Sequence, residues 1–197
     1  MSEAGALGPL EARVEAVLFS SAEPVPLGRL AVACGVREAQ IRQAIGQLRL
    51  HLDAHGHGVS LCELAGGFQL LTREEHAEAV TLLAAPRAHP LSRAALEVLA
   101  IVAFRQPVTR AAVDELRGVH SDGALATLVE RGLVGEQGRA DGPGRPILYA
   151  TTRRFLEQFG LRSLEDLAEL DSTAEAGLPL LRGATARSGD DSQDSDR

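Results

Sequence analysis

The sequence predicts a mainly α-helical protein with small β wings, built from two tandem copies of one supersecondary unit. Hydrophobic residues make up 45 % of the 197 positions and aromatic residues only 3 %, so the core must be aliphatic. Apolar residues recur at helical spacing through most of the chain. A Pro-Val pair at position 24 and a Gly-Val pair at position 35 recur 83 residues later, at 107 and 118. This repeat indicates two similar units in one chain.

In the first copy, three helices are expected before a hairpin. The first helix carries an apolar stripe, and the second, over Leu27–Ala31, ends before Gly35, a residue type typical of helix C-termini. A third helix, about Arg37–Asp53, has apolar residues at i, i+3, i+4, i+7 and i+11. The apolar stripe of the first helix consists of Leu10, Val14, Val17 and Leu18.

A β-hairpin follows these helices. Two short runs of strand-forming residues, Val59–Leu64 and Phe68–Thr72, flank the Gly66-Gly67 pair, which favours a tight hairpin turn. A closing helix is expected over Arg73–Leu83. Three helices followed by a hairpin is the element order of a winged-helix domain.

The second copy repeats this order. Its first helix follows Ser92 and is apolar over Ala94–Phe104 except at one glutamate, so we expect it to be covered on nearly all sides. The second helix covers Thr109–Leu116, and the third, about Asp122–Arg131, is expected to turn Leu125, Leu128 and Val129 inward. The wing strands are expected at Leu133–Glu136 and Ile147–Ala150, around a loop rich in Gly, Pro and Arg.

These elements predict two tandem winged-helix domains, over residues 10–86 and 91–170. Residues 1–9 are expected to be flexible. Residues 171–197 carry six acidic and three basic side chains and few large apolar residues, which predicts a disordered acidic tail. No apolar run approaches the ~18 residues of a membrane span, and the N-terminus lacks the features of a signal peptide. The sequence therefore predicts a cytoplasmic protein.

Charge argues against tight nucleic-acid binding. The net charge is −7, all 20 basic residues other than histidine are arginine, and the predicted third helices carry net charges of only +1 and −1. Because binding to the DNA backbone depends on many Lys and Arg contacts to phosphate, direct nucleic-acid binding should be weak or absent. A winged-helix transcription regulator that binds DNA stays open as the alternative function.

Residues that could carry chemistry have simpler structural interpretations. A chain without Lys has no Schiff-base or P-loop lysine, and we expect no catalytic residues and no cofactor. Cys34 and Cys62 are expected in the core, and Glu97 in a buried pair with an arginine. His51 and His55 lie one helical turn apart with His57 nearby, but we favour a polar helix end over a metal site. The Gly- and Pro-rich stretch at 142–146 is expected to be a wing turn.

The second copy closely resembles the segregation and condensation protein B family, the small accessory subunits of bacterial condensin. The matching stretches are LSRAALE at 91–97, QPVTR at 106–110, RGVHSDG at 117–123, LVERGL at 128–133, GRPILYATT at 144–152 and FLEQFGL at 155–161. The first copy matches more loosely, through EAVLF at 15–19, AEP at 22–24 and AGGFQLLT at 65–72. His120 departs from the pattern, because the family usually has Asn there.

This resemblance implies a non-enzymatic adaptor located in the cytoplasm with the nucleoid. It implies a homodimer formed mainly by the N-terminal domains, and binding to the kleisin subunit (ScpA), which in turn bridges the heads of the SMC ATPase. Such a subunit supports chromosome condensation and segregation during cell division. No membrane contact is expected.

The residues expected at the two interfaces follow from this interpretation. An interface is often anchored by aromatic residues and arginine, so Tyr149, the only tyrosine, is a candidate for kleisin binding. Packing of Tyr149 on its own core is an equal alternative. The full set expected to bind kleisin is Arg117, His120, Asp122, Arg145 and Tyr149, and the set expected at the dimer interface is Leu10, Val14, Val17, Leu18 and Phe68.

Overall fold

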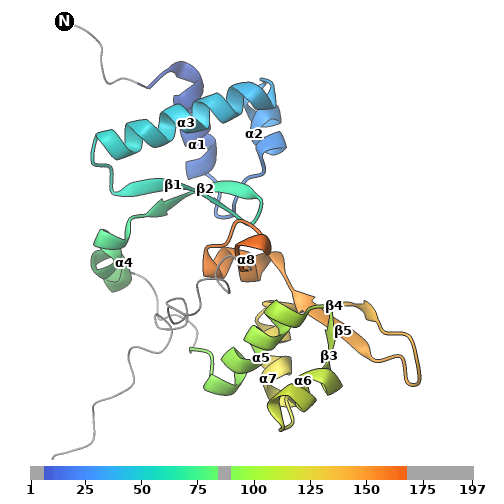
Figure 1. The fold of residues 1–197 in the computed structure, drawn as a ribbon. Coiled ribbons are helices and arrows are strands. Elements are labelled where there is room, and N and C mark those ends of the chain that lie inside the picture. The colour runs from blue at the N-terminus through green and yellow to red at the C-terminus, as the bar shows by residue number, and fades with distance from the viewer. Residues whose placement is uncertain (1–6, 84–89, 168–197) are drawn as a thin grey trace, which may run out of the picture. The chain divides into compact units, whose positions relative to one another are not determined.

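The computed structural model describes residues 7–83 and 90–167. These residues are mostly helical, with two small antiparallel sheets among them, and they fall into two compact units (Figure 1). Unit 1 contains the described residues up to 83 together with Leu156–Ser163, and unit 2 contains the rest. The mainly helical fold class with small β-sheets is confirmed.

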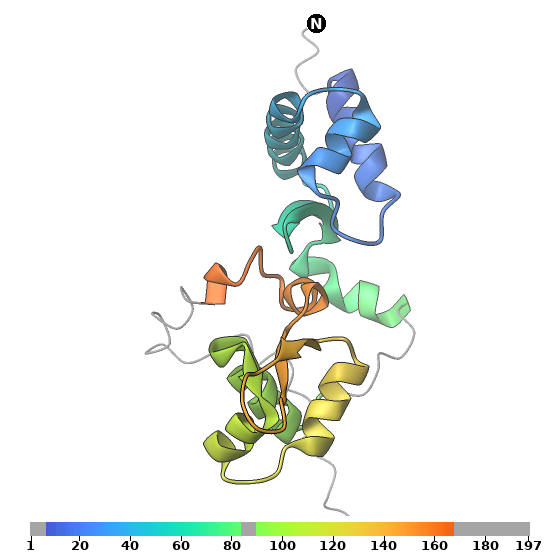
Figure 2. The same ribbon diagram turned by 90° about the vertical axis from the view of Figure 1, so that its right-hand side faces the viewer.

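Unit 1 begins with three helices, α1 (Pro9–Phe19), α2 (Leu27–Cys34) and α3 (Glu38–Ala54). α3 packs against both α1 and α2, and the three lie side by side in Figure 2. The spacing of apolar residues in α3 is helical, and all five predicted positions are buried: Ile41, Ala44, Ile45, Leu48 and Leu52. α2 ends at Gly35, whose φ of 69° is left-handed and suits glycine.

The hairpin of unit 1 consists of β1 (Val59–Leu64) and β2 (Gly67–Thr72), paired antiparallel from Val59 opposite Thr72 to Leu64 opposite Gly67. Gly67 is required by close packing, because a Cβ there would lie 2.9 Å from the backbone of Pro24 and Val25. The expected closing helix begins instead with a 3₁₀ turn, η1 (Glu74–His76), and continues as α4 (Ala77–Leu83).

A later segment of the chain covers the turn of this hairpin. The amides of Ala65 and Gly66 donate hydrogen bonds to the carbonyls of Leu161 (2.8 Å) and Arg162 (3.0 Å). Leu161 itself is buried. Residues 156–163 therefore pack with unit 1, whereas the expected second domain over 91–170 includes them.

Unit 2 contains α5 (Arg93–Arg105), α6 (Arg110–Arg117) and α7 (Asp122–Glu130). The hydroxyls of Ser92 and Thr109 accept hydrogen bonds from the amides of the third residues of α5 and α6, as expected of N-caps. α5 buries six apolar residues, although Phe104 near its end is exposed.

The sheet of unit 2 has three strands in the order β3-β5-β4: β3 (Val108–Thr109), β4 (Val134–Arg139) and β5 (Ile147–Thr151). The two-residue strand β3 was not predicted, because two residues are too short for a period to show. β4 extends three residues past the expected end, with a register shift between Glu136 and Gly138. The last described helix, α8 (Arg153–Phe159), buries Phe155.

Several predictions on single residues are corrected. Val129 does not point inward with Leu125 and Leu128, because 39 % of it is exposed. Glu97 does pair with arginine, but its side chain is 48 % exposed rather than buried. Cys34 is buried as expected, whereas Cys62 is only half-buried because it lies on a two-stranded hairpin.

Some predictions fall outside the described residues. These are the acidic tail over 171–197 and most of the flexible N-terminus over 1–9. Among the helices that are described, none combines the length and the hydropathy needed to cross a bilayer.

Candidate functional site

The turn between α6 and α7 is held by a carboxylate of α6. The backbone amide of Ser121 donates a 2.7 Å hydrogen bond to Oδ1 of Asp114, and Nδ1 of His120 lies 3.7 Å from Oδ2 of the same carboxylate. Arg110, at the start of α6, forms an ion pair with Asp122, at the start of α7. The first turn of α7 is thus fixed to α6 at two points.

The environment of Asp114 favours its ionised form. Burial alone raises the pKa of this carboxyl group, but hydrogen bonds from the Ser121 hydroxyl and amide act in the opposite direction. The positive charges of His120 and Arg110 add to them, and the pKa of Asp114 is lowered below its usual value. Asp114 is therefore a stable anion that orders the turn.

Arg117 connects this turn to α5. Its guanidinium donates to Oγ of Ser121 (3.1 Å) and to Oε2 of Glu97 (3.2 Å), and Glu97 also accepts from Arg93 (3.2 Å). Only 10 % of the Arg117 side chain is exposed, and its Nε atom has no hydrogen-bond partner among the described residues. Arg117 therefore positions the turn from inside unit 2.

A groove of about 380 Å³ lies beside this turn, between α7 and the sheet. Apolar and aromatic side chains from α7 and β5 form much of its wall, and charged side chains from α6, α7 and β4 surround them. Tyr149 pairs with Val108 on one side and Glu136 on the other, so the sheet holds it at the groove. The lining residues are Arg110, Asp122, Leu125, Ala126, Val129, Glu130, Glu136 and Tyr149.

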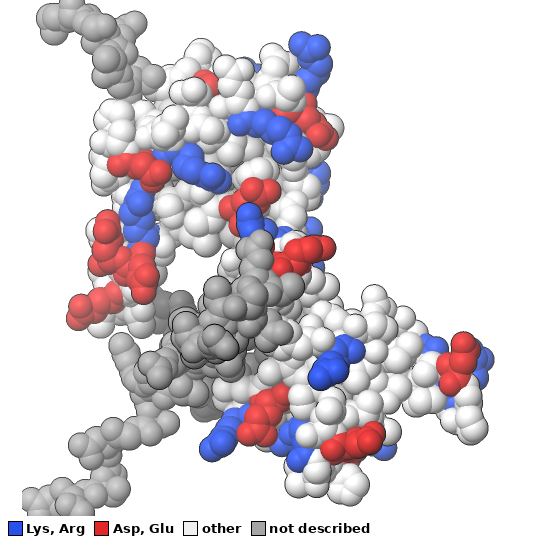
Figure 3. All heavy atoms as spheres, in the orientation of Figure 1, with Lys and Arg blue, Asp and Glu red and all other residues white. Residues whose placement is uncertain are grey.

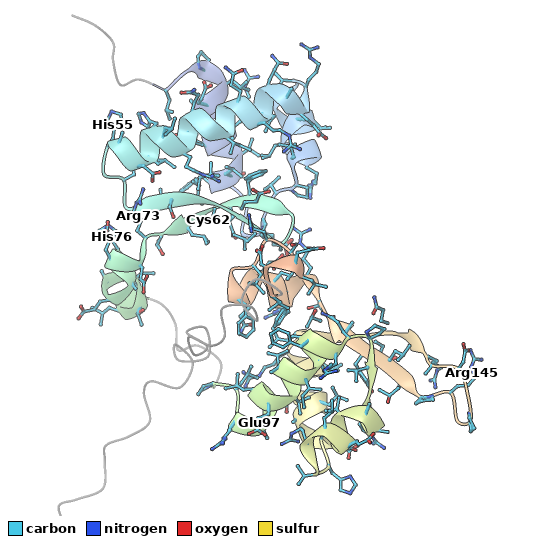
Figure 4. All side chains as sticks on the ribbon, in the orientation of Figure 1. His55, Cys62, Arg73, His76, Glu97 and Arg145 are labelled. Carbon is cyan, nitrogen blue, oxygen red and sulfur yellow. The ribbon has the colours of Figure 1, made fainter. Side chains whose placement is uncertain are left out.

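The five residues expected to bind kleisin fall into three places. Asp122 and Tyr149 line the groove, and Arg117 and His120 belong to the adjoining turn. Arg145 lies apart from them at the tip of the wing, where its carbonyl accepts a 3.0 Å hydrogen bond from Arg139 (Figure 4). The structure thus brings four of the five to one end of unit 2.

Several residues of this site were not predicted from the sequence. The contacts of Arg110 with Asp122 and of Asp114 with Ser121, and the place of Glu136 in the groove, depend on tertiary packing. Ala126 and Val129 gave a readable signal, since they lie three residues apart on the predicted third helix and so share one face. That face is turned to the groove rather than to the core.

The residues expected at the dimer interface lie in or against the core of unit 1. Val14, Leu18 and Phe68 are buried there, and Leu10 and Val17 pack against the same cluster. The three buried side chains therefore offer little surface to a second copy, whereas Leu10 and Val17 are only partly buried. The apolar side chains that unit 1 does present to the surface include Phe19, 84 % exposed, together with Val32 and Leu50.

Charges of both signs are interspersed over the face of the molecule seen in Figure 3, which shows no continuous basic field. One group of potential metal ligands, Asp114, His120 and Asp122, has its ligand atoms within 4.8 Å of one another. Both carboxylates already have partners in Ser121 and Arg110. This group is therefore explained by its role in the turn.

Comparison with known proteins identifies the family. Residues 12–170 match the family model described as segregation and condensation complex subunit ScpB. The chain belongs to this family. It is 46 % identical to segregation and condensation protein B of Geobacillus thermodenitrificans over 177 residues, 89 % of this chain and 85 % of that protein. It is 49 % identical to the protein of the same name from Syntrophotalea carbinolica, over 84 % of each chain.

Among solved structures, a dimer of a ScpB N-terminal domain complexed with a ScpA peptide is 37 % identical. The match covers 42 % of this chain and all of that one, with a TM-score of 0.38. The resemblance to the ScpB family expected from the sequence is confirmed by the family model and the relatives. The chain is accordingly a subunit of the segregation and condensation complex.

Proposed function

We propose that this ScpB family member is a non-catalytic adaptor made of two tandem winged-helix domains. It forms a homodimer through unit 1 and binds the kleisin ScpA through unit 2. Through the kleisin it reaches the heads of the SMC ATPase at the nucleoid, in the cytoplasm. In this role it supports chromosome condensation and segregation. Membership of the ScpB family and the geometry of unit 2 support the proposal.

The observation that carries the kleisin-binding role is the groove of unit 2. Its apolar wall, with Val129 and Tyr149, offers burial to the apolar side chains of a peptide segment. Its charged residues are three carboxylates and one arginine, and the arginine is already paired with Asp122. A groove of this composition disfavours a phosphate backbone and favours a protein segment that carries apolar and basic side chains.

The element order of both units supports the winged-helix interpretation. In each unit three helices precede a β-hairpin, and a short extended segment after the first helix pairs with the hairpin. In unit 1 this pairing is a single bridge between Val25 and Phe68, and in unit 2 it is β3 on β5. In both units, the valine of the repeated Pro-Val pair therefore pairs with a strand of the hairpin.

The exposed apolar residues of unit 1 are the candidates for the dimer surface. Phe19 is exposed at the end of α1, Val32 on α2 and Leu50 on α3. Such side chains lose unfavourable contact with water when a second copy covers them. Phe19→Ser should therefore shift the protein from dimer to monomer without opening the core formed by Val14 and Leu18.

The kleisin-binding role is tested by a matched pair of substitutions in unit 2. Val129→Glu places a charge in the groove and should weaken ScpA binding at least about tenfold, roughly 1.4 kcal/mol. Leu116→Glu is the control, because Leu116 is also exposed and apolar in unit 2 but does not line the groove. Titration calorimetry with ScpA should find the control within about twofold of wild type. An unchanged affinity for Val129→Glu would contradict the groove as the docking site.

A further inference from the structure

Three histidines gather at the C-terminal end of α3 in unit 1. The ring of His51 lies 4.3 Å from that of His55 and 5.5 Å from that of His57, measured between ring centroids. His51 lies in the last turn of α3 and His55, four residues later, is the residue that caps the helix. The adaptor role proposed above makes no use of this cluster.

The turn after α3 brings His57 back to the helix. Gly56 adopts a left-handed φ of 64°, and the amide of His57 donates a 3.2 Å hydrogen bond to the carbonyl of Leu52. This six-residue closure is a Schellman motif, a fixed way for a helix to end. It holds His57 beside the last turn of α3 in place of the apolar contact that often accompanies the motif.

Arg73 of the neighbouring hairpin fixes this turn from the other side. Its Nε atom donates a 2.8 Å hydrogen bond to the carbonyl of His57, and its guanidinium pairs with Asp53 at 2.5 Å. In Figure 4, His55 at the end of α3 and Arg73 at the end of the hairpin lie at the same end of unit 1. The backbone that carries the three imidazoles is therefore held by hydrogen bonds both to α3 and from Arg73.

The hydrogen bonds leave ring nitrogens available to a ligand. Nδ1 of His55 lies 2.9 Å from the carbonyl of His51, a contact that only an Nδ1–H can donate, so Nε2 is the ring nitrogen that remains for a ligand. Histidines that bind metal commonly donate their other ring N–H to a backbone carbonyl in this way. Within the described residues, no hydrogen bond occupies a ring nitrogen of His51 or His57.

The electrostatics of the helix end favour a cation. The last carbonyls of a helix and its dipole place partial negative charge at its C-terminus. The positive charge of Arg73 is offset by Asp53, with which it forms an ion pair. A divalent ion bound by neutral imidazoles at this end of α3 meets no unpaired positive charge within the turn.

We propose that His51, His55 and His57 form a binding site for a divalent transition-metal ion of the kind that prefers imidazole, such as Zn²⁺. Two histidines at i and i+4 form a recurring metal-binding pair on helices, and His57 provides a third ligand. Imidazole nitrogens bind Zn²⁺ at about 2.0–2.1 Å, so the side chains must rotate to bring one nitrogen of each ring around a single ion. The bound ion ties the end of α3 to the start of the hairpin.

The site is independent of kleisin docking and is tested with the full chain and Zn²⁺ alone. Metal-free protein titrated with ZnCl₂ should take up one ion per chain in calorimetry. The double variant His51→Gln, His55→Gln should lose at least about tenfold in affinity, and His57→Gln should also bind more weakly. His120→Gln is the matched control, since it removes the histidine of the alternative group with Asp114 and Asp122. That control should bind Zn²⁺ as wild type does.

Paramagnetic Co²⁺ gives a second readout that needs no substitution. In NMR spectra of the wild-type protein, the imidazole signals of His51, His55 and His57 should shift or broaden at one equivalent of Co²⁺, and those of His120 should not. The proposal is overturned if the protein takes up no Zn²⁺. It is equally overturned if His120→Gln removes the binding and the double variant leaves it intact.

Discussion

Both units place an aromatic residue opposite the valine of the repeated Pro-Val pair, but they use it differently. Phe68 exchanges two backbone hydrogen bonds with Val25 in unit 1 and is only 7 % exposed, within the core. Tyr149 pairs with Val108 in unit 2 and lines an open groove. The same position in one supersecondary unit therefore stabilises the core in unit 1 and lines the groove in unit 2.

The two hairpins also differ in how far the chain itself covers their turns. The turn of the unit 1 hairpin is covered by the chain itself, through the bonds from Ala65 and Gly66 to Leu161 and Arg162. The wing of unit 2 has a longer turn, with Arg145 exposed at its tip. In unit 1 the hairpin turn is already covered by the unit's own chain, so it offers less surface to a partner. We therefore assign kleisin docking to unit 2.

The largest expected effect comes from removing the buried aromatic residue. Phe68→Ala removes a ring from the core of unit 1 and should lower the free energy of unfolding of that unit by about 3–5 kcal/mol. Hydrogen exchange followed by mass spectrometry measures this loss separately in each unit. Amides of α3 should exchange faster and those of α7 should not. Equal loss of protection in both units would contradict the separation between them.

The next effect distinguishes binding from stability. Tyr149→Ala should weaken ScpA binding at least about tenfold, because aromatic side chains in a groove often anchor an interface. Its effect on unfolding should be clearly smaller than that of Phe68→Ala, since Tyr149 is only half-buried. Calorimetry with ScpA and urea unfolding of the same samples give the two values. A variant that unfolds as easily as Phe68→Ala but binds normally would reverse the assigned roles.

The stability that the turn before α7 gives to unit 2 should depend on pH. Because the pKa of Asp114 is lowered in the folded state, its carboxylate stabilises unit 2 above the unfolded-state pKa of about 3.9. This contribution is lost as the pH falls from there through the folded-state pKa. The difference in unfolding free energy between wild type and Asp114→Asn should therefore be largest near neutral pH and shrink in acid. Urea unfolding at pH 7 and pH 3 measures it, and a difference that grows in acid would contradict the assigned sign.

The smallest effect is expected at the tip of the wing. Arg145→Glu changes an exposed charge outside the groove, so ScpA affinity should change by less than about fivefold. Any change should shrink at high salt, because exposed charges are screened. Calorimetry at low and high salt checks both points. A loss as large as that of Val129→Glu would move the docking surface onto the wing.

The sequence predicted the regular elements well because each depends on local signals. Neighbouring residues are enough to predict the apolar period of α3, the caps at Ser92 and Thr109, the helix end at Gly35 and the Gly66-Gly67 turn. The strand β3 and the packing of Leu161 on the unit 1 hairpin were missed, because both depend on contacts between residues far apart in the sequence.

The candidate site was predicted only in part for the same reason. Asp122 and Tyr149 were identified, but the carboxylate of Asp114 that orders the turn could not be, since its partner Ser121 is seven residues away across a turn. Val129 was expected in the core, because an apolar residue beside Leu128 fits a core position as well as it fits a position that lines a groove. The exposure of Val129 in the folded unit shows that it lines the groove and does not lie in the core.

Light scattering on a sizing column tests whether the protein is an adaptor that docks its kleisin through unit 2. The full chain is measured alone, with ScpA from the same genome, and with Val129→Glu in place of wild type. We expect a dimer when the chain is alone, a defined heteromer with ScpA, and a variant that stays dimeric but no longer shifts. A wild-type protein that is monomeric, or one that does not associate with ScpA, would contradict the adaptor role.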